Sequence, residues 1–254
     1  MSDLELKALV FDVFGTVVDW RTSIANEVSN QLKNKGFDLN WLAFSEAWRA
    51  KYQPSMEGVR SGKRGYVRLD VLHLENLMEV LEEFKVSGLS SAELDYLNRA
   101  WHRLKPWPDS VSGLQRLKKK FIIGTMSNGN VALMVNMAKH SGLPWDVILG
   151  AEPAQAYKPD PKTYQTGVDW LGLQTDEVLM CAAHNNDLVA ARDQGLKTAF
   201  IARPTEYGKD QSVDIKAEHA FDFITTDLNA LADQLGCEIA GENNVSCISL
   251  RRIL

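Results

Sequence analysis

The sequence contains little cysteine, no long apolar run and no excess of positive charge. Its three cysteines, Cys181, Cys237 and Cys247, show neither metal-ligand spacing nor the even count of a disulfide framework. No stretch approaches the roughly 18 consecutive apolar residues that a membrane-spanning helix needs. The first ten residues also lack the basic and apolar regions of a signal peptide. We therefore expect a cytoplasmic protein with no membrane partner.

The net charge of -5 gives no indication of the basic surface that binds nucleic acid, so we expect no nucleic-acid partner. With 45% hydrophobic and 24% charged residues, the composition is typical of a globular chain rather than a disordered one. A chain of 254 residues can bury a sizeable core and can form one domain or two.

Short apolar runs alternate with helical patterns along much of the chain. The runs predict strands of a parallel sheet covered on both faces, at 7–13, 121–127, 147–149, 178–182, 198–202 and 221–224. Helices are predicted between them at 111–119, 131–141, 161–171, 186–194 and 228–235, and a glycine follows four of these. This alternation predicts an α/β fold with a doubly wound, Rossmann-like parallel sheet.

One connection is far longer than the others. Residues 14–120 separate the first two predicted strands, whereas a crossover needs only about a dozen residues. This stretch predicts helices at 23–35, 42–60, 67–84 and 92–104, and the prolines Pro106 and Pro108 then prevent further helix. We expect residues 20–105 to form a helical cap domain, inserted into an α/β core domain of residues 1–19 and 106–254.

Polar side chains follow four of the predicted strands, at the sheet edge where ligands of open α/β sheets bind. A carboxylate that ends a buried strand is costly unless it has partners or a function. Helix N–H groups beside a hydroxyl and an amide suit an anion, and prolines would hold a loop lysine in place. The four segments are Asp-Val-Phe-Gly-Thr (12–16), Ser-Asn-Gly (127–129), Lys-Pro-Asp-Pro (158–161) and His-Asn-Asn-Asp (184–187).

In this order and spacing, the four segments resemble the motifs of the haloacid dehalogenase superfamily. The resemblance covers residues 6 to about 235 and implies a helical cap over an α/β core. Most members are Mg-dependent phosphatases with a second Asp, the general acid, two residues after the nucleophile. Phe14 stands there, and a phenyl ring cannot protonate a leaving alkoxide. The chain is therefore more similar to the type II L-2-haloacid dehalogenases, which need no metal or other cofactor and commonly carry Tyr or Phe there.

The resemblance implies that Asp12 attacks the halogen-bearing carbon, and that the resulting ester is then hydrolysed. An opposite charge such as Lys158 would keep Asp12 ionised. The segment around Arg49 resembles the cap helix that carries the halide-binding arginine. The predicted catalytic residues are Asp12, Thr16, Lys158, His184 and Asp187. The predicted substrate-binding residues are Val13, Phe14, Ser127, Asn128 and Tyr164, and the predicted halide-binding residues are Arg49 and Asn128.

The fourth motif departs from the best-known members, which often have Ser and Asn where this chain has Ala182 and His184. It stays open whether Asp187 or His184 activates the water, and Asp187 is expected to orient the ring. The expected substrates are haloacetates and L-2-halopropionate. A tight pocket with His184 would favour small haloacetates, fluoroacetate among them. Halide is the expected second product, and the resemblance implies a homodimer.

Each of these residues also has an ordinary structural interpretation. Asp12 and Asp19 suit turns or helix caps, Arg49 suits a salt bridge, and His184 suits backbone groups that need a partner. Tyr164 suits the core with a bonded hydroxyl. Two other functions therefore remain open: a Mg-dependent small-molecule phosphatase, and a non-catalytic binding protein on the same fold.

Overall fold

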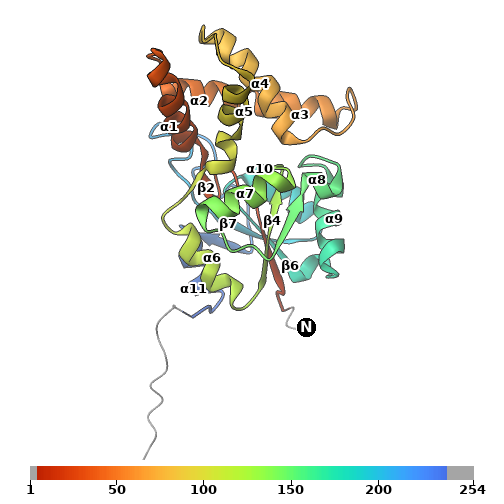
Figure 1. Ribbon diagram of the computed structural model, residues 1–254. Coiled ribbons are helices and arrows are strands. Elements are labelled where there is room, and N and C mark those ends of the chain that lie inside the picture. The colour runs from red at the N-terminus through yellow and green to blue at the C-terminus, as the bar shows by residue number, and fades with distance from the viewer. Residues whose placement is uncertain (1–4, 239–254) are drawn as a thin grey trace, which may run out of the picture.

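A computed structural model of the chain describes residues 5–238. Its centre is a six-stranded sheet in the order β5-β4-β1-β6-β7-β8, and every neighbouring pair is parallel (Figure 1). The strands are β1 Ala8–Phe11, β4 Ile122–Ser127, β5 Val147–Gly150, β6 Val178–Ala182, β7 Lys197–Ile201 and β8 Phe223–Thr225. The predicted doubly wound α/β fold is thus confirmed, with β1 in the middle of the sheet.

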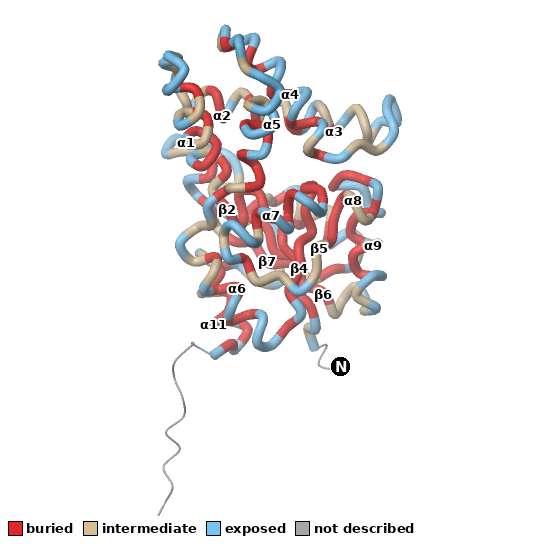
Figure 2. The backbone as a smooth tube through the Cα atoms, viewed as in Figure 1, coloured by how far each residue is buried: buried red, intermediate tan, exposed pale blue. Residues whose placement is uncertain are grey.

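Helices cover both faces of the sheet, and the alternation of β1 side chains shows how. Leu9 and Phe11 pack with apolar residues of the helices on one face, whereas Ala8 and Val10 pack with those on the other. Figure 2 shows the strands mainly in the colour of buried residues. One face carries α6 Ser110–Lys118, α7 Val131–Ser141 and α11 Leu228–Gln234, and the other carries α9 Pro161–Leu171 and α10 Asn185–Asp193. The short elements α8 Ala151–Ala154 and η3 Thr175–Glu177 complete this part of the chain.

The connection between β1 and β4 is helical, as predicted, and lies above the carboxyl edge of the sheet (Figure 1). The chain leaves along β2 Val18–Asp19 and returns along β3 Lys105–Pro106, and these two strands pair antiparallel. The two segments that connect the helical insertion to the rest of the chain therefore lie side by side. The helices between them are α1 Trp20–Leu32, η1 Lys33–Lys35, α2 Trp41–Ala50, α3 Tyr52–Arg60, α4 Leu69–Glu83, α5 Ser91–Asn98 and η2 Arg99–Arg103.

The single helix predicted over residues 42–60 is wrong, because the structure has two helices, α2 and α3, with Lys51 between them. Pro54 explains the break. Proline has no N–H to bond the carbonyl four residues earlier, so it is tolerated only in the first turn of a helix, where it stands in α3. The end of the helix predicted over 92–104 also differs, since residues 99–103 form the 3-10 segment η2.

Several local predictions agree with the structure. Gly142 and Gly172 end α7 and α9 in the left-handed conformation, with φ of 68° and 65°. Cys181 and Cys237 are free and buried, and Cys247 lies outside the described residues. Asp19 caps α1 by accepting a hydrogen bond from Thr22 N at 3.0 Å. No helix in residues 5–238 combines the length and apolar character needed to span a bilayer.

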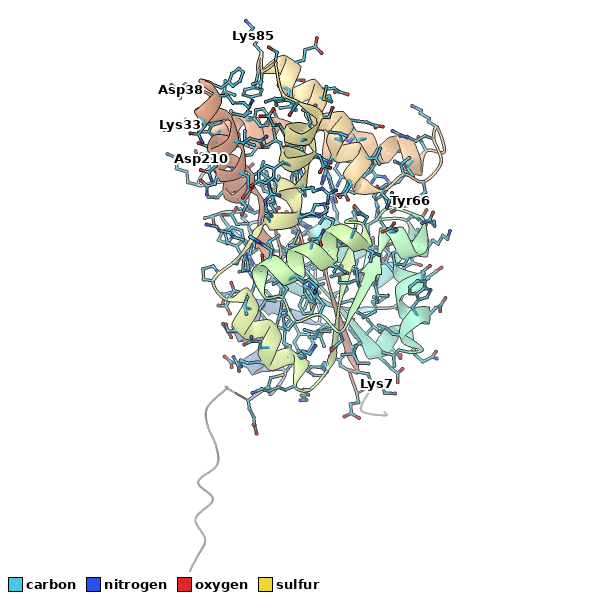
Figure 3. All side chains as sticks on the ribbon, viewed as in Figure 1. Lys7, Lys33, Asp38, Tyr66, Lys85 and Asp210 are labelled. Carbon is cyan, nitrogen blue, oxygen red and sulfur yellow. The ribbon has the colours of Figure 1, made fainter. Side chains whose placement is uncertain are left out.

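Side chains of the helical insertion, from its loops as well as its helices, also contact the α/β part of the chain. Tyr66, labelled in Figure 3, places its ring 5.4 Å from the ring of Tyr157, whose hydroxyl donates to Val67 O at 2.6 Å. At the start of α4, Asp70 accepts a hydrogen bond from Asn130 Nδ2 at 2.9 Å. These contacts join the helical insertion to the loops that follow β4 and β5.

Candidate active site

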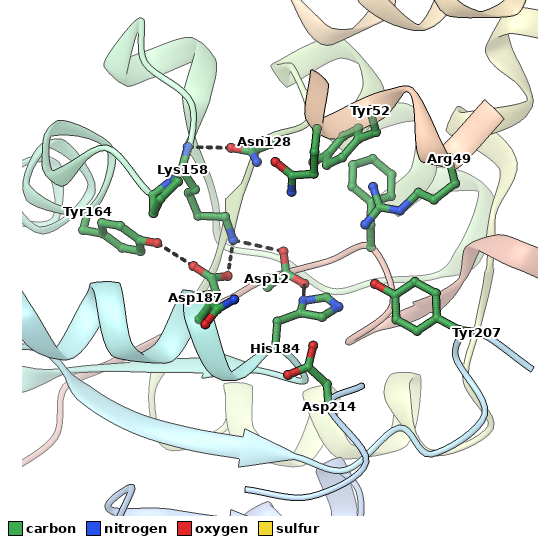
Figure 4. Close-up of a pocket in the computed structure, with 14 residues that line it drawn as sticks. Asp12, Arg49, Tyr52, Asn128, Lys158, Tyr164, His184, Asp187, Tyr207 and Asp214 are labelled. Atoms are coloured by element: carbon green, nitrogen blue, oxygen red, sulfur yellow. Dashed lines mark hydrogen bonds and ion pairs between the residues drawn. The ribbon is translucent and has the colours of Figure 1, made fainter. Parts of the chain in front are cut away.

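The carboxyl ends of β1, β4 and β6 meet beneath the inserted helices at a cavity of about 220 Å³ (Figure 4). This is the place where parallel α/β sheets bind ligands, because the loops after neighbouring strands converge there. Residues from the core and from α2 and α3 line it together. They are Asp12, Phe14, Arg49, Tyr52, Gln53, Asn128, Lys158, Pro159, Tyr164, His184, Asn186, Asp187, Tyr207 and Asp214.

Asp12 directly follows β1, and the sheet fixes its backbone through a hydrogen bond from its N–H to Cys181 O at 3.0 Å. Its side chain is buried, with 9% exposure. Thr16 donates its hydroxyl to Asp12 Oδ2 at 2.8 Å. The Thr16 oxygen in turn accepts from Ala183 N at 2.9 Å, which leaves the hydroxyl hydrogen for Asp12. The carboxylate is therefore held rigidly at the cavity floor.

Lys158 connects the carboxylate of Asp12, which follows β1, with that of Asp187, which lies in the first turn of α10. Its Nζ lies 3.0 Å from Asp12 Oδ1 and 2.5 Å from Asp187 Oδ2 (Figure 4). The other oxygen of Asp187 accepts from the Tyr164 hydroxyl at 2.6 Å. The backbone of Lys158 is anchored as well, since its N–H donates to Asn128 Oδ1 at 2.8 Å. Because the Asn128 oxygen accepts this bond, the NH₂ group of the same amide is the part that can donate to a ligand.

These contacts set the charge states. Burial by itself would raise the pKa of Asp12, but the Lys158 ammonium and the His184 ring outweigh it and hold that pKa well below its usual range. Burial likewise opposes the charged form of Lys158, yet its two carboxylate partners raise its pKa above the ordinary value. Asp12 is consequently a carboxylate and Lys158 an ammonium at neutral pH.

His184 lies between Asp12 and a carboxylate that the sequence analysis did not single out. Its Nδ1 is 3.2 Å from Asp12 Oδ2, and its Nε2 is 3.0 Å from Glu206 Oε2. Glu206 is 1% exposed and also accepts from Trp20 Nε1 at 2.9 Å. Its carboxylate packs on Gly15, where φ is 87° and any Cβ would collide with Glu206.

The expectation that Asp187 orients the His184 ring is therefore wrong. Both nitrogens of the His184 ring have other partners. The two carboxylate oxygens of Asp187 accept hydrogen bonds from Lys158 and Tyr164 instead. The reason is geometric: Asp187 lies within the first turn of α10, whereas His184 precedes that helix and extends toward the loop after β7. Although burial opposes protonation, the carboxylates of Glu206 and Asp12 raise the pKa of His184 well above its ordinary value.

Arg49 reaches the cavity from α2 and is held by aromatic rings. Its Cζ lies 4.1 Å from the centre of the Tyr52 ring and 5.4 Å from that of Trp20. Its Nη1 is buried and has no hydrogen-bond partner among residues 5–238. A buried cationic donor without a partner is costly, and an anion in the cavity would satisfy it.

Comparison with known proteins identifies the family. Residues 6–195 match the model of the haloacid dehalogenase-like hydrolases. The chain belongs to this family. It is 30% identical to (S)-2-haloacid dehalogenase 4A of Burkholderia cepacia over 211 residues, which are 80% of this chain and 87% of that protein.

Two solved structures of family members are similar in both sequence and fold. A defluorinating L-2-haloacid dehalogenase shows 49% identity and a TM-score of 0.90, covering 91% of this chain and 96% of its own. An L-2-haloacid dehalogenase shows 45% identity and a TM-score of 0.88, covering 91% of this chain and 99% of its own. The predicted superfamily, fold and hydrolase class are thus confirmed.

Some of the predicted site residues line the cavity and others do not. Phe14, Asn128 and Tyr164 line the cavity together with the charged groups. Val13 and Ser127 are fully buried and do not line it, and the Ser127 hydroxyl accepts from Gly129 N at 3.1 Å. Their roles in substrate binding stay predictions, as do all the assigned roles.

Several residues at or next to the cavity were not predicted from the sequence, among them Gln53, Glu206, Tyr207 and Asp214. Glu206 and Tyr207 follow β7, so the rule that ligands bind at strand ends, applied to this strand too, would have pointed to them. Nothing in the pattern around Gln53 or Asp214 distinguishes either from a surface residue. In the part of the chain that the structure describes, no group of three or more His, Cys, Asp or Glu side chains could hold a metal ion.

Proposed function

We propose that this family member hydrolyses small 2-haloalkanoic acids to 2-hydroxy acids through an ester on Asp12, without a metal ion or cofactor. One observation supports this above all: a buried, ionised Asp12 and an Arg49 guanidinium whose Nη1 has no partner among the described residues share one small cavity. A nucleophile and an anion site on a single cavity suit a substrate that releases an anion. The names of the relatives, which are haloacid dehalogenases, support this substrate class.

In the first step, an Asp12 oxygen attacks the halogen-bearing carbon as the carbon–halogen bond breaks, which inverts that carbon and releases halide. Arg49 and the Asn128 amide would stabilise the departing halide. Asn128 and the N–H groups after Ser127 would bind the substrate carboxylate. Phe14 would supply the apolar wall of the cavity. Partial desolvation of Asp12 by burial makes it a stronger nucleophile than a hydrated carboxylate.

In the second step, water attacks the Asp12 carboxyl carbon and frees the hydroxy acid. Asp187 is the proposed base, because it faces the cavity and is aligned by the Tyr164 hydroxyl and the Lys158 ammonium. Thr16 would hold the Asp12 carboxyl group in place while water attacks.

The first experiment measures halide release from chloroacetate and L-2-chloropropionate in the presence of EDTA, for the wild type and Asp12→Asn. We expect release that survives EDTA and falls by about 10⁴-fold or more in the variant, since the nucleophile is lost. Absence of halide release, together with Mg-dependent cleavage of a phosphate ester, would replace this proposal with the phosphatase alternative. If the protein shows neither halide release nor phosphate-ester cleavage, the non-catalytic binding protein remains as the interpretation.

Fluoroacetate is a proposed substrate as well. The cavity is small, and a relative at 49% identity is a defluorinating enzyme. Fluoride is a strong hydrogen-bond acceptor, and the unpartnered Nη1 of Arg49 is a suitable donor. An ion-selective electrode should detect fluoride from fluoroacetate, at a lower rate than chloride from chloroacetate. Chloride release without any fluoride release would limit the proposal to weaker carbon–halogen bonds.

The oligomeric state, the cellular location and the domain bounds are proposals as well. We propose a homodimer, a cytoplasmic location, and a cap domain of residues 20–105 over a core of residues 1–19 and 106–254, of which 1–4 and 239–254 lie outside the described residues. Light scattering on the purified chain tests the dimer. A monomer at micromolar concentration would contradict it.

A further inference from the structure

The His184 ring has a carboxylate at each of its two nitrogens. Asp12 Oδ2 is 3.2 Å from Nδ1, and Glu206 Oε2 is 3.0 Å from Nε2. A carboxylate only accepts hydrogen bonds, so both contacts are satisfied only when both ring nitrogens carry hydrogen. This geometry fits an imidazolium that donates to Asp12 and is held from behind by Glu206.

The donors around Asp12 are distributed unequally over its two oxygens. Oδ2 faces two, the Thr16 hydroxyl and the His184 ring, whereas Oδ1 faces only the Lys158 ammonium. A carboxylate oxygen offers about two lone pairs, so Oδ1 retains one for attack and Oδ2 does not. Oδ1 is therefore the attacking atom, and Oδ2 becomes the carbonyl oxygen of the ester.

A second cationic donor, at Oδ2, adds little to the first step, because Lys158 already pairs with Asp12 and a further cation withdraws charge from the nucleophile. It helps the second. When water adds to the Asp12 carboxyl carbon, negative charge develops on Oδ2, where Thr16 and His184 already point their hydrogens. Donors aimed at the developing charge stabilise the transition state strongly.

We propose that His184 is a catalytic residue for hydrolysis of the Asp12 ester, and that Glu206 is the residue that positions it. This inference rests on the proposed function. As water adds, one of its protons passes to Asp187 and the charge appears on Oδ2. The bond from the carboxyl carbon to Oδ1 then breaks, and Oδ1 leaves as the oxygen of the hydroxy acid with the proton from Asp187. The new Asp12 carboxyl group finally loses its own proton to solvent.

The surroundings of His184 favour the protonated ring. Acidic groups reach it from several elements, whereas the Lys158 ammonium binds the other oxygen of Asp12 and the Arg49 guanidinium lies over the Tyr52 ring. Glu206 and Asp12 raise the pKa of His184 despite its burial. The charged or titratable groups on this side of the cavity are Asp12, Arg49, Lys158, Asp187, Glu206, Tyr207 and Asp214.

The test separates the two chemical steps in Glu206→Gln, which keeps the size of the side chain and removes its charge. Rapid quenching with chloroacetate should show one chloride released per active site at a rate within about 2-fold of wild type. Steady-state turnover should fall about tenfold, since the positioned cation is weakened. The ester should then accumulate, visible as one carboxymethyl group on the peptide that contains Asp12. His184→Ala, which removes the donor, should lose about 10²-fold in ester hydrolysis.

The pH profile provides a readout that a merely structural role would not change. A raised pKa means that the cationic ring persists through neutrality and is lost as pH rises through that pKa. Ester hydrolysis in wild type should thus decline on the alkaline side, and in Glu206→Gln the decline should move to lower pH. In Glu206→Asp, which keeps the carboxylate, the decline should lie between the pH of wild type and that of Glu206→Gln. Glu27→Gln is the matched control, because Glu27 is ion-paired with Arg103 away from the cavity.

Fluoroacetate makes the assignment sharper, because it gives the same ester as chloroacetate. The variants should slow decay of this ester equally, whichever halogen was lost. Equal loss of the chloride burst and of turnover, without accumulated ester, would overturn the inference while leaving the proposed function intact. So would an unchanged alkaline limb in Glu206→Gln. Failure of the proposed function is distinct, since wild type would then release no halide.

Discussion

The core and the inserted helices contribute to the cavity in opposite ways. On the core side, Asp12, Lys158 and Asp187 satisfy one another through short contacts. On the side of the inserted helices, Arg49 faces aromatic rings and leaves Nη1 without a partner among the described residues. Folding alone completes the first set of charges, whereas an anion is needed to complete the second. Groups of the core should therefore matter for stability and catalysis together, and Arg49 mainly for catalysis.

Among the variants that compare the two sides of the cavity, Lys158→Met should have the largest effect, because it removes the shared cation of two buried carboxylates. The pKa of Asp12 should rise, so Asp12 loses its charge and activity falls by about 10³-fold or more. Breaking a buried pair also costs roughly 3–5 kcal/mol of stability at pH 7. Halide release and urea unfolding measure the two losses.

The pH dependence of that stability loss gives a check on its cause. Carboxyl groups with a raised pKa bind protons more readily in the folded state, so the variant should regain stability as pH falls. Lys162→Met on the exposed start of α9 is the control and should change little. A loss of stability that is the same at pH 5 and pH 7 would show that packing of the lysine stem, rather than its charge, is responsible.

Arg49→Met should give the reverse pattern, with a fall in kcat/KM of about 10²-fold and no loss of thermal stability. An unpartnered buried donor costs about 1–3 kcal/mol, and methionine removes it while keeping most of the packing of the stem. Bromide should raise the melting temperature of wild type by binding the folded state, and should do so far less in the variant.

Arg64→Met is the control for Arg49→Met, because the Arg64 guanidinium pairs with Glu75 at the surface. A large drop in melting temperature in Arg49→Met, with bromide stabilisation retained, would refute the contrast between the two sides of the cavity.

The sequence predicted the core side more completely than the other. Apolar runs specify buried parallel strands, and the polar residue after each run must lie at one sheet edge, so Asp12, Lys158 and Asp187 could be placed together. Arg49 could be placed only by resemblance, since no periodicity says which face of α2 meets a cavity.

Other features could not be predicted because they depend on distant segments. Glu206 meets His184 through the loop after β7, and their pairing across 22 positions leaves no local signal. The end of α2 was missed for a different reason. The helical spacing of apolar residues shows no interruption between α2 and α3. Only Pro54, which has no backbone N–H to donate, indicates that one helix ends and another begins.

The smallest effect should come from the contact that joins the two regions. Asp70 at the start of α4 lies 2.9 Å from His102 Nε2 and accepts from Asn130 Nδ2, just beyond β4. Burial would raise the pKa of Asp70, but His102 and Asn130 outweigh it and lower that pKa. Asp70→Asn should cost about 1 kcal/mol, or a melting temperature lower by about 2–4 °C, with turnover nearly unchanged.

The sign of the shift fixes the pH dependence of this last contact. A carboxyl group with a lowered pKa stabilises the fold above its unfolded value of about 3.9, and that contribution disappears as pH falls through the folded value. The difference between wild type and Asp70→Asn should thus be full near pH 6 and shrink toward pH 3. Asp95→Asn, at an exposed pair with Arg99, should show almost none of it. A difference that persists at pH 3 would mean that shape rather than charge joins α4 to the core, and that the two regions are coupled only by packing.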